Sequence, residues 1–244
     1  MRLAALGAAS AAAAVLAHGA PSVAVLGALA PYQPPTAGPW LRWRARPEQG
    51  AVALTFDDGP EPGACEANLK LLAEFELPAT FFLIGEAAEA SPELVDAIVA
   101  GGHELACHGY RHEHHLLRSP SWVRDDLERG VAALARSPHP PRFFRPPFGQ
   151  ASSASVRAAR ALGLELVLWS AWGREFAETD DAAVLARLER GLRPGAIVCL
   201  HDADTYASPG TAARTRRVLP KLAAALEHRG LKATTLGALV GSRP

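Results

Sequence analysis

Two adjacent carboxylates, Asp57 and Asp58, stand in the sequence TFDDGP directly after an apolar run. Neighbouring carboxylates repel each other, and their pKa values separate unless a cation joins them. One of the pair can therefore ligate a metal ion while the other accepts a proton during catalysis. The alternative is an ordinary turn, because Asp, Gly and Pro are all common turn residues.

His108 and His112 form an H-x3-H pair, and side chains four residues apart can face the same way on a helical turn or tight loop. Imidazole nitrogen is a ligand for Zn2+, Co2+ and Ni2+. With Asp58 the pair makes a His2Asp set, and three protein ligands with open positions are typical of catalytic zinc. His114 and His115 follow closely, so these residues alone leave the second histidine ligand open, with a solvated histidine-rich loop as the alternative.

Arg145 and His201 are two further polar residues at the ends of apolar runs. Arg145 opens the sequence RPPFG, where two prolines fix the backbone and the guanidinium can hold a carboxylate through two hydrogen bonds. His201 ends the run AIVCLH, and an imidazole that titrates near neutral pH can act as an acid or a base. Taken singly, Arg145 is better explained as a surface arginine and His201 as a core histidine, and only their convergence with the other polar residues would favour function.

The elements that must position these residues alternate between short β-like runs and amphipathic helical stretches. Strands are predicted at residues 51–56, 79–84, 103–107, 142–144, 164–169, 196–201 and 231–235. Helices are predicted near residues 63–75, 91–100, 121–136, 152–162, 181–191 and 211–229. This alternation is typical of a parallel sheet with right-handed crossovers.

We expect an α/β fold, a distorted (β/α) barrel of about seven parallel strands, with a doubly wound sheet as the alternative. In α/β barrels the chemistry lies at the C-terminal ends of the strands. The polar residues singled out above all follow strand candidates: Asp57, Asp58, His108, Arg145 and His201. The topology therefore predicts that they converge on one rim.

Composition limits the classes of function. Of the 244 residues, 49% are apolar, which is enough for a sizeable core. Lys and Arg number 25 and so do Asp and Glu, so neither a basic face nor a nucleic-acid partner is expected. Cys65, Cys107 and Cys199 are widely spaced, which favours buried positions over a disulfide framework. Alternation along a strand would place Cys199 on the same face as His201.

The chain before the barrel divides into two zones. Residues 1–31 are rich in Ala, Leu and Val and contain no Asp, Glu, Lys or Arg after Arg2, so we expect a membrane-directed segment. A secretory signal, a single anchor, a hairpin broken at residues 19–21 and a disordered tail remain alternatives. Residues 32–50 are Pro-rich and predict a linker, and residues 51–240 predict one catalytic domain.

Taken together, TFDDGP, H-x3-H, RPPF and LHD resemble the motifs of the polysaccharide deacetylases, also called the NodB homology domain or carbohydrate esterase family four. The resemblance covers residues 51–237 and implies a deformed (β/α) barrel. It implies that Asp57 is the general base and that Arg145 orients it. One divalent metal ion, Zn2+ or otherwise Co2+ or Ni2+, would be bound by Asp58, His108 and His112.

The same resemblance assigns residues to the acyl group and the leaving nitrogen. The backbone N–H of Phe148 would help to bind the oxyanion, and His201 would be the general acid. Leu200 would line the pocket for the acetyl methyl group. The family usually has Tyr where this chain has Phe148, and a main-chain role tolerates either ring.

Residues 169–176, WSAWGREF, depart from the family pattern. Glu175-Phe176 stands where Asp-Trp is expected, and Trp172 stands where an earlier Asp is often found. Glu175 can still pair with His201 and raise its pKa, and Phe176 can still offer an aromatic wall to the substrate. Trp169 and Trp172 either pack in the core or stack against sugar.

These motifs predict a metal-dependent hydrolase that removes N-acetyl groups from amino sugars of a polysaccharide or cell-envelope glycan. One alternative is a deacylase or deformylase of a lipid-linked amino sugar, which the apolar N-terminus favours. Another is a non-catalytic carbohydrate-binding protein, which predicts the loss of a key residue, whereas all six are present: Asp57, Asp58, His108, His112, Arg145 and His201. We expect a monomer in the cell envelope, either membrane-associated or exported.

Overall fold

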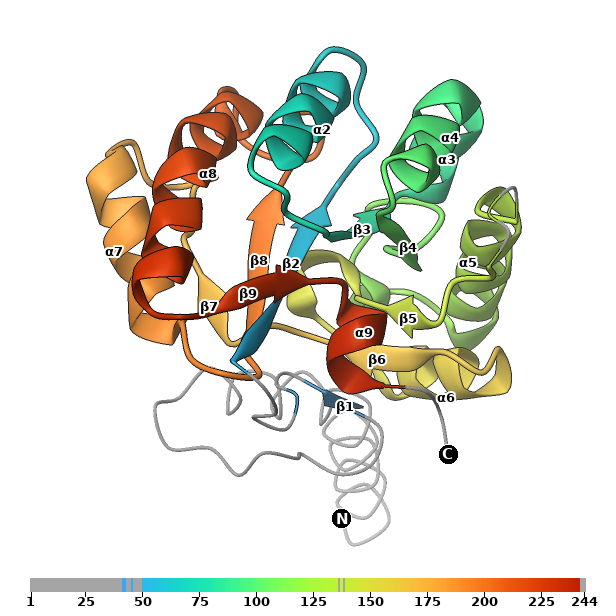
Figure 1. The fold of residues 1–244 in the computed structure, drawn as a ribbon. Helices are drawn as coiled ribbons and strands as arrows, with labels where there is room; N and C mark the ends of the chain where they lie inside the picture. The colour runs from blue at the N-terminus through green and yellow to red at the C-terminus, as the bar shows by residue number, and fades with distance from the viewer. Residues whose placement is uncertain (1–40, 43–44, 46–49, 136, 138, 242–244) are drawn as a thin grey trace, which may run out of the picture.

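The computed structural model describes residues 41–42, 45, 50–135, 137 and 139–241. Its centre is a nine-stranded sheet in which every strand pair is parallel (Figure 1). The strands are β1 (Leu41–Arg42), β2 (Ala51–Asp57), β3 (Thr80–Leu83), β4 (Glu104–Cys107), β5 (Phe143–Phe144), β6 (Glu165–Val167), β7 (Ala171–Trp172), β8 (Ile197–His201) and β9 (Lys232–Thr234).

The strand order is β1-β6-β5-β4-β3-β2-β8-β7, and β9 pairs with β2 beside this path. The sheet curls, and in the described part of the chain β1 and β7 form its two ends, so the barrel is incompletely closed. The predicted distorted (β/α) barrel is confirmed, and all seven predicted strands are present. The structure adds β1 and β7, each only two residues long.

Helices surround the outside of the sheet (Figure 1). They are α2 (Ala64–Glu74), α3 (Gly85–Ala90), α4 (Pro92–Ala100), α5 (Pro120–Ala133), α6 (Ser153–Ala161), α7 (Asp181–Gly191), α8 (Thr211–His228) and α9 (Leu236–Val240). Six of them match the predicted helices, and α3 and α9 are additional. Local sequence sets several of their starts: Ser119 accepts a hydrogen bond from the N–H of Trp122 at the start of α5, where Pro120 follows.

The central strand β2 is buried on both faces, as parallel sheets covered by helices require. Val52, Leu54 and Phe56 share one face and are fully buried in the hydrophobic core. Thr55 and Asp57 share the other face, which points into the barrel, because Asp57 lines the central cavity. The interior therefore receives polar side chains from a central, buried strand.

The base of the barrel, where the strands begin, takes up part of the predicted linker. Arg42 of β1 pairs with Glu165 of β6 at 3.0 Å, and Arg142 reaches the same carboxylate at 2.8 Å. The N–H of Ala45 donates to the carbonyl of Gly195 at 2.9 Å. The predicted segment at residues 1–31 lies outside the described residues. Within those that are described, no helix combines the length and apolar character needed to cross a bilayer.

Candidate active site

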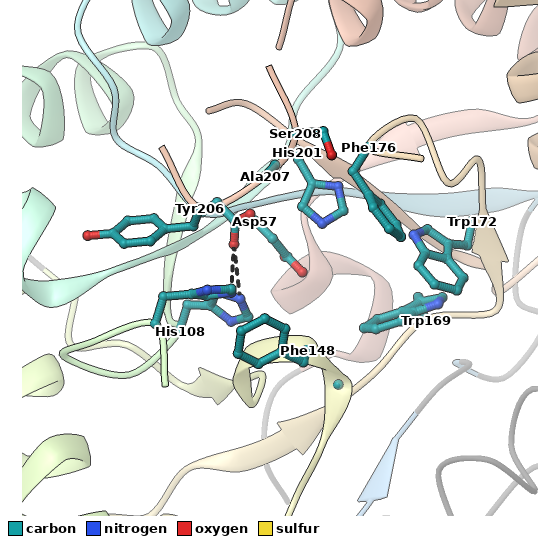
Figure 2. Close-up of a pocket in the computed structure, with 13 residues that line it drawn as sticks. Asp57, His108, Phe148, Trp169, Trp172, Phe176, His201, Tyr206, Ala207 and Ser208 are labelled. Carbon is teal, nitrogen blue, oxygen red and sulfur yellow. Dashed lines mark ion pairs between the residues drawn. The ribbon is translucent and has the colours of Figure 1, made fainter. Parts of the chain in front are cut away.

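The polar residues at the strand ends meet at one rim of the barrel. Asp57 ends β2, His201 ends β8, and His108 and Arg145 directly follow β4 and β5. Asp57, His108 and His201 line a cavity of about 310 Å³, shown in Figure 2, and Arg145 contacts Asp57. The cavity is lined by Asp57, Asp58, His108, His112, Phe148, Gly149, Trp169, Trp172, Phe176, His201, Tyr206, Ala207 and Ser208. The predicted convergence is thus present in the structure.

Asp58, His108 and His112 form a compact buried group. Oδ1 of Asp58 lies 3.4 Å from Nε2 of His108 and 3.3 Å from Nε2 of His112, the two contacts dashed in Figure 2. One ligand atom from each residue lies within 4.8 Å of the others. The neighbouring histidines 108, 201 and 112 outweigh burial, which acts in the opposite sense, and lower the pKa of Asp58 to about 2. The carboxylate is therefore ionised at neutral pH.

The hydrogen bonds of this group fit a bound cation. Nδ1 of His108 lies 2.7 Å from the carbonyl oxygen of Arg145, and a carbonyl can only accept, so Nδ1 carries the hydrogen. In the neutral ring Nε2 then holds a lone pair directed at Asp58. Oδ1 of Asp58 is buried and has no hydrogen-bond partner among the described residues. Lone pairs that converge without a proton between them are what a metal ion requires.

His112 rather than His114 or His115 completes the group. Burial lowers the pKa of His112 to about 4, although Asp58 opposes the shift, so the ring is neutral at physiological pH, the state in which imidazole ligates metals. His114 instead stacks on Phe148, with ring centroids 3.7 Å apart. His115 is fully buried, and its Nε2 lies 3.3 Å from Oδ2 of Asp126.

Asp57 is held from both sides. Nη1 of Arg145 lies 2.5 Å from Oδ1 of Asp57 and also donates to Oγ1 of Thr55 at 2.9 Å. The guanidinium is fully buried, and its Nη2 donates to the carbonyl of Leu168 at 3.1 Å. Sγ of Cys199 lies 3.5 Å from the other oxygen, Oδ2. The carboxylate is thus fixed in orientation and paired with a cation that has no exposure to water.

His201 pairs with the acidic residue that departs from the family pattern. Nδ1 of His201 lies 2.7 Å from Oε1 of Glu175, which is fully buried. Burial by itself would lower the pKa of His201, but Glu175, followed by Asp58 and Asp57, raises it to about 9. At neutral pH the ring is therefore an imidazolium. Because Glu175 occupies Nδ1, the other ring nitrogen, Nε2, is left for the cavity.

Aromatic side chains form one wall of the cavity beside His201. Trp169, Trp172, Phe176 and His201 follow one another with ring centroids 5.2, 5.5 and 5.6 Å apart. Trp169 is only 7% exposed and still lines the cavity, so it serves the core and the site together. Leu200 is fully buried and is not among the residues that line the cavity, so the structure does not bring it to the predicted methyl pocket.

Phe148 also lines the cavity, within the 3₁₀ turn η2 (Pro147–Gly149). Its backbone adopts φ 59° and ψ 10°, a left-handed conformation that is an outlier for a bulky residue. The ring is 48% exposed, and its centroid lies 4.3 Å from that of His112. Backbone strain of this kind persists where the surrounding structure requires it, as at functional sites.

Tyr206 is a site residue that the sequence analysis missed. It lies between β8 and α8, its ring centroid is 5.1 Å from that of His112, and its hydroxyl donates to Oε1 of Glu86 at 2.9 Å. A signal was present in the length of residues 202–210, because most βα loops have about two to six residues and longer ones at this rim commonly carry function.

The barrel has the features of a hydrolase. Around one cavity at its rim it gathers a His2Asp group, a carboxylate paired with arginine and a histidine paired with a carboxylate. The sequence pattern that defines the polysaccharide deacetylase family matches residues 44–167. A peptidoglycan-N-acetylglucosamine deacetylase of Bacillus cereus is 31% identical over 186 residues, covering 75% of this chain and 86% of that protein. A chitooligosaccharide deacetylase of Bradyrhizobium is 35% identical over 191 residues, covering 75% of this chain and 87% of that protein.

Solved structures share the fold. A mutant of a carbohydrate esterase family 4 pseudoenzyme with restored enzymatic activity, whose wild-type form comes from Bacillus anthracis, superimposes with a TM-score of 0.75 at 25% identity. The match covers 84% of this chain and 72% of that one. The chain therefore belongs to the polysaccharide deacetylase family, whose enzymes are hydrolases that act on N-acetyl amide bonds.

Proposed function

We propose that this protein is a metal-dependent hydrolase that releases acetate from N-acetylated amino sugars of a cell-envelope glycan. The observation that carries the proposal is the assembly of three groups around one cavity: the His2Asp group, the Asp57–Arg145 pair and the His201–Glu175 pair. Relatives that are named as deacetylases of peptidoglycan N-acetylglucosamine and of chitooligosaccharides support this substrate class.

Asp58, His108 and His112 would hold the metal ion. Their nitrogen and oxygen donors suit Zn2+, which we propose as the bound ion, with Co2+ and Ni2+ as alternatives. When bound, a divalent cation supplies Lewis-acid polarisation of the amide carbonyl and lowers the pKa of the attacking water. The buried Oδ1 of Asp58 supports this assignment, because it has no hydrogen-bond partner among the described residues and a cation would compensate its lost hydration.

The remaining groups divide the proton transfers between them. Oδ2 of Asp57 accepts a proton from the attacking water, since Arg145 occupies Oδ1. The backbone N–H of Phe148 helps to bind the oxyanion, and one such donor is worth about 3 kcal/mol in other enzymes. Nε2 of His201 then protonates the leaving nitrogen, a step that typically contributes about 10²–10⁴-fold. The products are acetate and a free amino sugar.

Different segments of the chain are assigned to catalysis and to localisation. We assign catalysis to residues 51–240, with β1 completing the sheet, and membrane association to residues 1–31. This places a monomeric enzyme in the cell envelope, where N-acetylated glycans occur. We propose that a sugar ring stacks on Phe176, beside the proposed acid His201, and on Trp169, further along the same aromatic wall.

A non-catalytic carbohydrate-binding protein is the second candidate, because a pseudoenzyme of this fold exists whose activity is restored in a mutant. The geometry favours an enzyme here. A protein that only binds glycan has no need for a buried base held by arginine or for a histidine kept protonated by a buried carboxylate.

The test is acetate release from three substrates: peptidoglycan glycan strands, chitooligosaccharides and a lipid-linked N-acylated amino sugar. We expect acetate from the glycans, loss of release with a chelator and recovery with Zn2+. The Asp57→Asn variant is the matched control, because it keeps the metal ligands. Glycan binding without acetate from the zinc-loaded protein would establish the non-catalytic alternative. Release of the acyl group from the lipid-linked substrate alone would establish the alternative of a deacylase or deformylase of a lipid-linked amino sugar.

A further inference from the structure

We propose that Asp57, Cys199 and His201 form a second metal site, which takes a thiophilic divalent cation and thereby inhibits the proposed reaction. One ligand atom from each of the three residues lies within 4.8 Å of the others, separately from the Asp58–His108–His112 group. Sγ of Cys199 is already 3.5 Å from Oδ2 of Asp57. Carboxylate, thiolate and imidazole are all ligands of zinc-like ions.

Sheet register places these three residues together on rigid elements. Cys199 pairs with Thr55 and His201 pairs with Asp57 where β8 runs beside β2. Because side chains alternate along a strand, Cys199 and His201 share the face on which Asp57 also lies. No loop has to move to bring the ligands together.

Each residue has one donor atom left for a cation. Arg145 occupies Oδ1 of Asp57, which leaves Oδ2. Glu175 occupies Nδ1 of His201, which leaves Nε2. With the Cys199 thiolate formed, the negative charges of Asp57, Cys199 and Glu175 outnumber the one positive charge of Arg145 by two. That excess balances a divalent cation.

The chemistry of the thiol sets which cation binds and when. Burial, and next Asp57, raise the pKa of the Cys199 thiol, so it stays protonated until a cation displaces its proton to solvent. Binding also releases the Nε2 proton of His201. Thiolate prefers a soft ion such as Cd2+. Zn2+ should bind the same site more weakly, and only when it is present in excess. A cation at this site removes the proposed base and acid from proton transfer together.

The experiment is a Cd2+ titration of the full chain already loaded with one Zn2+. Two signals are recorded, the ultraviolet charge-transfer band of a cadmium thiolate and acetate release relative to each variant's own activity. The wild type should gain the band and lose activity as one further equivalent of cation binds. Cys199→Ala should lack the band and need at least about tenfold more Cd2+ for half-inhibition. Loss of a residue that only hydrogen-bonds to a metal ligand already lowers metal affinity about tenfold, and loss of the ligand itself should lower it by at least as much.

Cys65→Ala and Cys107→Ala are the matched controls, because each removes a buried thiol that belongs to neither group of candidate metal ligands. Both should respond to Cd2+ as the wild type does. The proposal is overturned if Cys199→Ala and wild type are inhibited at the same Cd2+ concentration, or if inhibition coincides with stoichiometric zinc release. A wild type without deacetylase activity would refute the proposed function, while the thiolate band would still report on the second site.

Discussion

Replacing Glu175 by Gln removes the negative charge 2.7 Å from Nδ1 of His201 and keeps the length of the side chain. Arg214 donates to the main-chain carbonyl of Glu175, a contact that the substitution leaves in place. The pKa of His201 is raised from 6.5 to about 9, which corresponds to about 3 kcal/mol in favour of the imidazolium. Burial acts in the opposite sense, so without Glu175 we expect the pKa to fall to about 6.5 or lower.

The assay is kcat for acetate release as a function of pH. A general acid must be protonated, so activity is lost as the pH rises through the pKa of His201. At about pH 7.5 the protonated fraction falls from nearly all to about a tenth, so Glu175→Gln should lose about tenfold in kcat there and little at about pH 5.5. Glu175→Asp keeps the charge and should keep the basic limb. If kcat of Glu175→Gln still declined only near pH 9, Glu175 would not be the group that raises the pKa of His201.

Three further substitutions test the site. Asp57→Asn should retain bound metal and lose about 10²–10⁴-fold in turnover; full activity would show that Asp57 is not the base. His108→Ala should lose metal, which elemental analysis of the purified protein would detect, and retention of one metal per chain would contradict the ligand assignment. Arg145→Ala should reduce the free energy of unfolding by about 3–5 kcal/mol, because it leaves the buried Asp57 carboxylate unpaired; an unchanged urea midpoint would show that the pair contributes no stability.

The longer elements of the fold could be predicted because they have a hydrophobic period. β2 and β8 are apolar runs closed by a polar residue, and that pattern also indicated the rim on which Asp57 and His201 lie. The two-residue strands β1 and β7 are too short for any period. Helix α3, with the sequence GEAAEA, has only small apolar side chains, so it has no apolar stripe to detect.

Within the site, what sequence alone missed depends on three-dimensional packing. The family motif selects His112 over His114, but only the structure gives the physical reason, because His114 stacks on Phe148 while His112 reaches Asp58. The left-handed backbone of Phe148 was unpredictable, since bulky residues rarely adopt it. Tyr206 belongs to a loop held by long-range hydrogen bonds to Glu86 and Glu61, which local sequence does not encode.

The position of β1 has a mechanical consequence. β1 runs parallel to β6, with Leu41 beside Leu166 and Arg42 beside Val167, so β1 begins at the same end of the barrel as the other strands (Figure 1). The catalytic rim is at the other end. Any support attached ahead of Leu41, whether a bead, a fusion partner or a bilayer, would therefore hold the domain at the end opposite the cavity. Changing the length of the segment that joins the support to β1 would alter the distance over which the cavity can reach substrate, and would leave the geometry of the site unchanged.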